Sequence, residues 1–206
     1  MDDVRELNAL QHDALREVAN IGAGHAATAL ALMTDRRVMI SVPRSTITPL
    51  EDVPALLGDP QDVVAAVLMH VHGDLTGRLL VLLPVADAKL LCDLLLHRPA
   101  GSTLEFGALE QSGLTEVGNI VGSAYLTALT AFMGMMLLPS VPSLAIDYCG
   151  AVLSTAHLGF GQDRDFVFCV ETDFHFHDID RILRGQVLLL PDLAALQAIL
   201  DAIRLT

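Results

Sequence analysis

The chain carries the same polar residue types twice, at the same spacing. The two sets, each with members at positions i, i+4 and i+7, are Asp13, Glu17 and Asn20, and then Ser112, Glu116 and Asn119. A carboxamide accepts and donates hydrogen bonds at once and can therefore orient a water molecule. A neighbouring carboxylate supplies a charge for docking a cation. Each set, called here the first site and the second site, therefore combines a carboxamide with a nearby carboxylate.

The spacing predicts that each set forms a narrow ridge on one helix, because successive residues of a helix are about 100° apart. The predicted apolar stripe beside these ridges consists of Leu7, Leu10, Val18 and Ile21 in the first half, and of Leu109, Val117 and Ile120 in the second. We expect both ridges to face solvent, away from a sheet. A ridge of this kind that occurred only once would be interpreted as an ordinary solvent-exposed helix face. Asn is a poor helix former, so its presence at both matched positions favours a function.

The two sites belong to an internal repeat. Residues 13–21 (DALREVANI) match residues 112–120 (SGLTEVGNI) at an offset of 99 residues (112 − 13 = 99), and the same offset places Pro43 on Pro142. The chain is therefore predicted to be a single domain of two repeats, about residues 1–104 and 105–206.

A second match lies near the end of each repeat. Residues 79–91 resemble residues 186–198, which places Pro84 on Pro191 at an offset of 107 residues (191 − 84 = 107). The second repeat is thus longer by eight residues, and we expect them in the polar loop 159–165.

Hydrophobic periodicity predicts a helix, strands and a second helix in each repeat. The elements expected in the first repeat are a helix at 3–33, strands at 38–42, 62–72 and 78–83, and a helix from Pro84 to about His97. Those expected in the second are a helix near 107–133, strands near 136–150, 151–158, 166–174 and 186–190, and a helix from Pro191 to Arg204. We predict an α+β fold, a pseudo-two-fold duplicated single domain with a mainly antiparallel sheet and two long motif-bearing helices packed on it.

Composition excludes several classes of protein. The 206 residues include 12 Lys and Arg against 25 Asp and Glu, a net charge of −13, which disfavours nucleic-acid binding. With 52% hydrophobic residues the chain can build a core, so disorder is excluded. Its three cysteines are far apart and lack a C-x-x-C spacing, which argues against a disulfide framework or a zinc site. No apolar signal segment follows the start MDDVREL, so a cytoplasmic location is expected.

Residues 120–146 contain no charged residue, and about 20 apolar residues can span a bilayer. Hydroxyl residues and two prolines interrupt them, so we expect a buried helix running into a core strand instead of a membrane span.

Three weaker motifs have simpler structural interpretations. The pairs His70-x-His72 and His175-x-His177 are expected on exposed strand faces, since neither has a third metal ligand at convincing spacing. Gly22-x-Gly24 lacks the strand and the third glycine of a dinucleotide site, and is expected to allow close approach of another backbone. The run GMMLL at 134–138 is either buried or a partner surface, and the sequence does not decide between them.

The pattern Asp/Ser-x-x-x-Glu-x-x-Asn, followed after 22 residues by Pro, occurs twice and resembles that of the CheC family of chemotaxis phosphatases, within the CheC/CheX/FliY superfamily. The likeness covers nearly the whole chain. The resemblance implies a protein-aspartyl-phosphate phosphatase acting on a phosphorylated CheY-like receiver. It assigns Asn20 and Asn119 to orienting the attacking water, and Glu17 and Glu116 to pairing with a receiver lysine.

The resemblance also implies supporting residues and partners. Asp13 and Ser112 open each motif, while Pro43 and Pro142 are expected to be structural, shaping the entry to a strand. No metal or cofactor is expected on this chain, because the receiver brings its own Mg²⁺. The receptor deamidase CheD is an expected second partner.

Three other functions compete with this interpretation. A non-catalytic adaptor that binds CheD or a receiver would be free to lose a Glu or Asn, yet both sites keep both residues. A flagellar-switch component, like FliY or FliM, would carry an additional C-terminal rotor module, and the chain ends at Thr206. A dimeric CheX-like protein would carry one motif instead of two.

Overall fold

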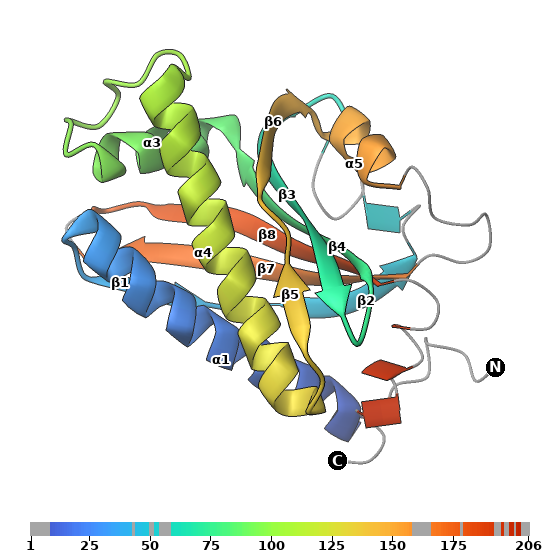
Figure 1. Ribbon diagram of the computed structural model, residues 1–206. Helices are drawn as coiled ribbons and strands as arrows, with labels where there is room; N and C mark the ends of the chain where they lie inside the picture. Colours follow the sequence, from blue (N-terminus) through green and yellow to red (C-terminus); the bar gives the residue numbers. More distant parts are fainter. Residues whose placement is uncertain are drawn as a thin grey trace.

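The computed structural model describes residues 9–42, 44–49, 52–53, 59–157, 166–177, 179–191, 195, 198–199 and 201–202. The elements, in chain order, are α1 (Ala9–Thr34), β1 (Val38–Ser41), β2 (Ser45–Pro49), β3 (Val63–Gly73), β4 (Gly77–Pro84), α3 (Val85–Leu95), α4 (Ala108–Met133), β5 (Leu137–Pro139), β6 (Ser143–Tyr148), α5 (Cys149–His157), β7 (Phe166–Phe176) and β8 (Ile182–Pro191) (Figure 1). The predicted α+β class is therefore confirmed.

The strands form one antiparallel sheet in the order β1-β7-β8-β4-β3-β5, with β2 also pairing with β7 and β6 also pairing with β3. The first strands of each half thus pair with the long strand of the other half. β4 and β8 pair at the centre, where Leu80 lies opposite Leu188 and Val81 opposite Val187. This pairing is unchanged when the halves are exchanged, as a pseudo-two-fold arrangement requires.

Helices cover both faces of the sheet. α1 and α4 lie on one face (Figure 1), and α5 packs against the other. Because alternate strand residues point to opposite faces, Leu79, Val81 and Leu83 of β4 join the core beneath α1 and α4. Leu80 and Leu82 join the smaller core beneath α5. This burial on both faces explains why residues 79–83 of β4 are an uninterrupted apolar run.

Both long helices end at a residue with left-handed backbone. Asp35 follows α1 with a φ of 52°, and Gly134 follows α4 with a φ of 66°. The Gly134 N–H donates to the carbonyl of Thr130, which satisfies one of the free carbonyls at the helix end. Each chain reversal returns the backbone to the sheet at the short strands β1 and β5.

The predicted hairpin between β3 and β4 is present, and Gly73 is required there. Its φ is 118°, and a Cβ added at this position would lie 2.2 Å from the carbonyl oxygen of Met136. No side chain fits in this space, so the glycine allows β5 to approach the turn.

The expected strand at 151–158 was wrong, because the chain forms α5 there. The residues that α5 buries are Cys149, Val152, Leu153 and Ala156, at positions i, i+3, i+4 and i+7. This is helical periodicity, and it overrides the β-branched and apolar content that suggested a strand. The strand β2 was not anticipated. Of the expected C-terminal helix, the described residues 195, 198–199 and 201–202 are helical, and Pro191 ends β8.

The eight additional residues of the second half are not confined to one loop. By pairing register β3 corresponds to β7 at an offset of 103 residues (176 − 73 = 103), because Val38 pairs with Phe176 and Leu137 pairs with Gly73. With that offset, the registers of β3 with β4 and of β7 with β8 place β4 on β8 at an offset of 106 residues (187 − 81 = 106). Four of the additional residues therefore precede β7, and three lengthen the connection from β7 to β8. The loop 159–165, expected to hold all eight, lies outside the described residues.

Candidate functional site

α1 and α4 carry the two sites and cross each other closely. A Cβ added at Gly22 of α1 would lie 3.0 Å from the Cα atom of Tyr125 in α4, so this glycine permits the backbone approach expected of the Gly22-x-Gly24 motif. A Cβ added at Gly24 would meet no atom within 4 Å, so this second glycine of the motif is not needed for a close approach. The polar residues of the two sites lie on the sides of the helices that face away from the sheet and from this crossing.

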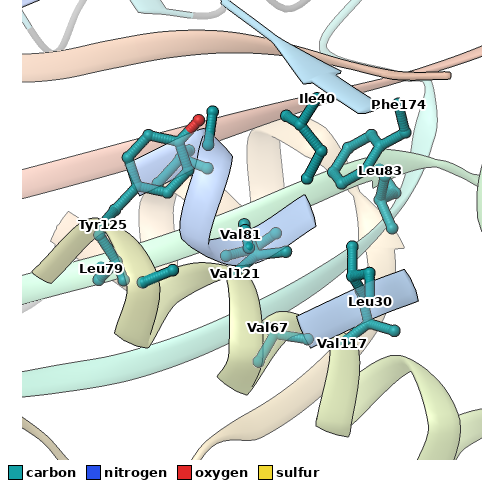
Figure 2. Close-up of a cluster of buried hydrophobic side chains, with 14 of the residues drawn as sticks. Leu30, Ile40, Val67, Leu79, Val81, Leu83, Val117, Val121, Tyr125 and Phe174 are labelled. Carbon is teal, nitrogen blue, oxygen red and sulfur yellow. The ribbon is translucent and has the colours of Figure 1, made fainter. Parts of the chain in front are cut away.

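The buried sides of the helices rest on the sheet. Figure 2 shows Val117, Val121 and Tyr125 of α4 together with Leu79 and Val81 of β4. The Tyr125 hydroxyl lies 3.3 Å from Thr172 Oγ1, and burial raises the pKa of Tyr125 to about 12. This phenol therefore remains neutral and acts as a packing group.

The first site lies at the surface of α1. The side chains of Asp13, Glu17 and Asn20 are exposed, while Val18 and Ala19 beside them are buried. Glu17 and Asn20 make no side-chain hydrogen bond or ion pair with another residue in the part of the chain that the structure describes. Their polar atoms thus face solvent.

The second site has the same spacing on α4 but a different environment. Ser112 and Glu116 are exposed, whereas Asn119 is half-buried. The Ser123 hydroxyl donates to Asn119 Oδ1 over 3.4 Å. The ridge of the second site therefore also faces solvent, with its carboxamide held by a neighbour one turn further along the helix.

Two residues of the predicted apolar stripe are not buried. Ile21 is 43% exposed and Leu109 is 62% exposed, although Val18 and Val117 are buried and Ile120 packs against the core. The buried stripe is therefore narrower than expected, and these two side chains lie outside it. Leu7 and the side chain of Leu10 lie outside the described residues.

Of the two prolines of the pattern, Pro142 lies among the described residues. Pro142 is half-buried and lies directly before β6, where it donates no ladder hydrogen bond. Pro43 lies outside the described residues.

Other groups with potential chemistry are not arranged as sites. His70, His72 and His177 are exposed, and His175 Nε2 lies 3.2 Å from Ser41 Oγ. The described residues contain no group of three or more His, Cys, Asp or Glu side chains that could hold a metal ion.

The three cysteines, Cys92, Cys149 and Cys169, are buried. Burial raises the pKa of Cys92 and of Cys169 to about 12, which leaves their thiols protonated and unreactive. No described helix is long and apolar enough to cross a bilayer. The uncharged stretch 120–146 forms the second half of α4, then β5 and most of β6.

Comparison with known proteins decides the family. Residues 10–47 match the model of the CheC-like family, a segment that spans the first site. The chain is 32% identical over 184 residues to the CheY-P phosphatase CheC of Bacillus subtilis, with 88% of each chain covered. This chain is a member of the CheC-like family.

Solved structures show the same fold for this CheC-like chain. FliY of Thermotoga maritima superposes with a TM-score of 0.75 at 18% identity, covering 97% of this chain and 98% of that one. The middle domain of FliM from H. pylori superposes with a TM-score of 0.66 at 12% identity, covering 95% and 99%. The fold of this chain is therefore shared with these two proteins.

Sequence reasoning missed one residue of the second site, Ser123. At the offset of 99 residues it corresponds to Gly24 of the first site, so the two helices differ at the position that follows the Asn by one turn. The sequence shows this difference among several others between the two segments, and the contact of Ser123 with Asn119 is visible only in the structure.

Proposed function

We propose that this CheC-like chain is a phosphatase that hydrolyses the phospho-aspartate of a CheY-like receiver. The observation that carries the proposal is the pair of matched Glu–Asn ridges on α1 and α4. Glu17, Asn20 and Glu116 are exposed, and Asn119 is half-buried and accepts a hydrogen bond from Ser123. Similarity to a protein named CheY-P phosphatase supports the same activity.

In this mechanism the substrate brings most of the chemistry. A phospho-aspartate is an acyl phosphate that is already reactive toward water, and the receiver holds its own Mg²⁺. What remains is to place one water molecule in line with the phosphorus atom. Asn20 and Asn119 orient this water through their carboxamides, which accept and donate hydrogen bonds together.

Glu17 and Glu116 have the docking role. Each lies one helical turn before the Asn of its site, where its carboxylate pairs with a lysine of the receiver. Asp13 and Ser112 open each ridge one turn earlier and orient the docking face. The chain itself needs no metal or cofactor for this chemistry, and the reaction belongs to the cytoplasm.

The test is phosphate release from a phosphorylated CheY-like receiver by the variant with both Asn20→Ala and Asn119→Ala. Removal of one water-orienting group typically lowers the rate about 10²-fold per site, so we expect accelerated hydrolysis to disappear. Circular dichroism should show an unchanged fold, and His25→Ala on the exposed surface of α1 serves as the control. Full activity in the double variant contradicts the role of the Asn residues.

A partner-binding role is a second candidate, favoured by one observation. Three exposed apolar side chains lie along this edge of the sheet: Met136 directly before the edge strand β5, Leu138 within it, and Val141 after it. The run at 134–138 is thus a surface for much of its length, and exposed apolar patches are typical of protein interfaces. We propose CheD as the partner for this surface, and adding CheD to the phosphate-release assay distinguishes a regulator of activity from a purely adaptor role.

A further inference from the structure

Besides the difference between Asp13 and Ser112 that opens each motif, the two sites differ in the residue that follows the Asn by one helical turn. On α4 the Ser123 hydroxyl donates to Asn119 Oδ1 over 3.4 Å, and both residues are half-buried. On α1 the corresponding residue is Gly24, and Asn20 is exposed without a partner among the described residues. The carboxamide of the second site is therefore held, and that of the first site is free to rotate.

The helix that carries Ser123 is itself firmly placed. A Cβ added at the preceding residue, Gly122, would lie 2.2 Å from Met69 Cε and 2.6 Å from Leu79 Cδ2, so α4 rests directly on β3 and β4. The hydroxyl of Thr127 donates to the Ser123 carbonyl over 2.8 Å. Ser123 and Asn119 thus lie on a helix that is packed closely against the sheet next to them.

The chemistry of the amide leaves room for both partners. A carboxamide oxygen has two lone pairs, and the amide nitrogen carries two N–H donors. Ser123 occupies one lone pair of Asn119 and leaves the second lone pair and both N–H groups for water. A group that is already oriented loses less rotational entropy when it positions a reactant, so its contribution to the rate is larger.

We propose that Ser123 is a positioning residue that orients Asn119, and that the second site therefore turns over faster than the first. This inference rests on the phosphatase function proposed above and ranks its two sites. It makes position 123, and its counterpart Gly24, the determinant of how hydrolysis is divided between α1 and α4.

The experiment uses the full chain in two single-site backgrounds, with a phosphorylated CheY-like receiver as substrate. Asn20→Ala leaves the second site alone, and Asn119→Ala leaves the first. Adding Ser123→Ala to the former should lower kcat about two- to tenfold with KM unchanged, because one neutral hydrogen bond is lost while alanine maintains the helix. Ser123→Thr, which keeps the hydroxyl, should retain kcat.

The reciprocal change tests the same idea at the first site. In the Asn119→Ala background, Gly24→Ser should raise kcat by a similar factor, because a Cβ at Gly24 meets no atom within 4 Å and the new hydroxyl lies one turn from Asn20. Ser154→Ala is the matched control. It removes an exposed helical hydroxyl of α5, which packs on the opposite face of the sheet.

The outcomes separate this inference from the proposed function. If the natural chain does not accelerate phosphate release from the receiver, the phosphatase proposal itself fails, and if the variant lacking both Asn residues keeps full activity, the role of the Asn residues fails. If that variant is inactive but Ser123→Ala leaves kcat of the second site unchanged, or changes only KM, the positioning role of Ser123 is overturned. A first site that turns over faster than the second overturns the ranking.

Discussion

At the scale of single residues, Glu17 and Glu116 provide the charge that each site presents to a partner. Both carboxylates are exposed and neither is neutralised by another described residue, although the chain as a whole is strongly acidic. An exposed carboxylate adds little to the stability of the fold. In the function proposed above, its role is complementarity to a cation on the docked protein, where like charges would repel.

Reversal of this charge should therefore weaken docking. In the Asn119→Ala background, which isolates the first site, Glu17→Lys should raise KM for a phosphorylated CheY-like receiver by at least about tenfold, because the new ammonium faces the receiver lysine. Steady-state phosphate release measures the change, and circular dichroism checks the fold. The control is Glu105→Lys, which reverses the charge of an exposed glutamate in the loop before α4. An unchanged KM in Glu17→Lys would count against the pairing role.

At the scale of elements, the junction between α3 and α4 sets where the second site begins. Asp93 is buried and accepts hydrogen bonds from the backbone N–H groups of Gly101, Ser102 and Thr103. The Glu110 carboxylate, in the first turn of α4, accepts a hydrogen bond from Arg98 over 2.6 Å. Glu110 is also placed to satisfy backbone N–H groups at the helix N-terminus, as in a capping box.

Backbone N–H groups at the start of α4 and the Arg98 guanidinium lower the pKa of Glu110 below its usual value of 4.5. The folded state therefore favours the carboxylate. The stability that Glu110 contributes is fully present above pH 4.5 and is lost as the pH falls through the lower pKa of the folded state. Glu110→Gln should thus unfold at lower urea concentration than the natural chain at pH 7, and the difference should shrink below pH 4.5.

Urea unfolding at pH 7, 5, 4 and 3.5 measures this dependence. Glu105→Gln, in the exposed part of the same loop, serves as the control and should follow the natural chain. A difference between Glu110→Gln and the natural chain that stays constant from pH 7 to pH 3.5 contradicts the assignment.

At the scale of the whole molecule, the halves complete one another. β1 and β2 pair with β7 of the second half, and β5 and β6 pair with β3 of the first. The helices follow the same rule, since α1 and α4 meet at Gly22 and Tyr125 over a common core. Each half separated from the other would expose sheet edges and one side of its long helix.

We therefore expect that neither residues 1–104 nor residues 105–206 folds as a monomer, and that the two pieces assemble when they are produced together. The physical reason is that a single repeat buries too little apolar surface to offset the entropy of ordering its chain. Thermal melting followed by circular dichroism, with size-exclusion chromatography, measures folding and assembly. A cooperative melting transition from either piece as a monomer would contradict the prediction.

Several features could be predicted because they depend on local periodicity. α4, expected near 107–133, spans Ala108–Met133, and the β3–β4 hairpin is where its glycines indicated. The prediction of a strand at 151–158 was wrong, because a short apolar segment is compatible with the periodicity of a strand and with that of a helix. The segment forms the helix α5, which buries one side against the smaller core. The prediction that Ile21 belongs to the buried stripe was wrong for a related reason. The angular position of a residue on a helix gives the direction of an apolar stripe but not its width.

The candidate sites divide in the same way. Spacing alone placed Glu17 and Asn20 on one helix face, and the second copy at Glu116 and Asn119 separated this pattern from an ordinary solvated surface. The hydrogen bond from Ser123 to Asn119 could not be read from spacing, because many residues four positions apart on a helix do not touch. The difference between the two sites is therefore a structural finding.

The amino-acid sequence by itself determined the family pattern, the doubled arrangement of polar residues and the period of the two long helices, since these depend on residue type and local spacing. Tertiary structure alone decided how the strands of one half pair with those of the other, which apolar side chains remain exposed, and how the two Asn environments differ. Those features depend on contacts between residues that are distant in the chain, and such contacts form only when α1 and α4 pack on a common sheet.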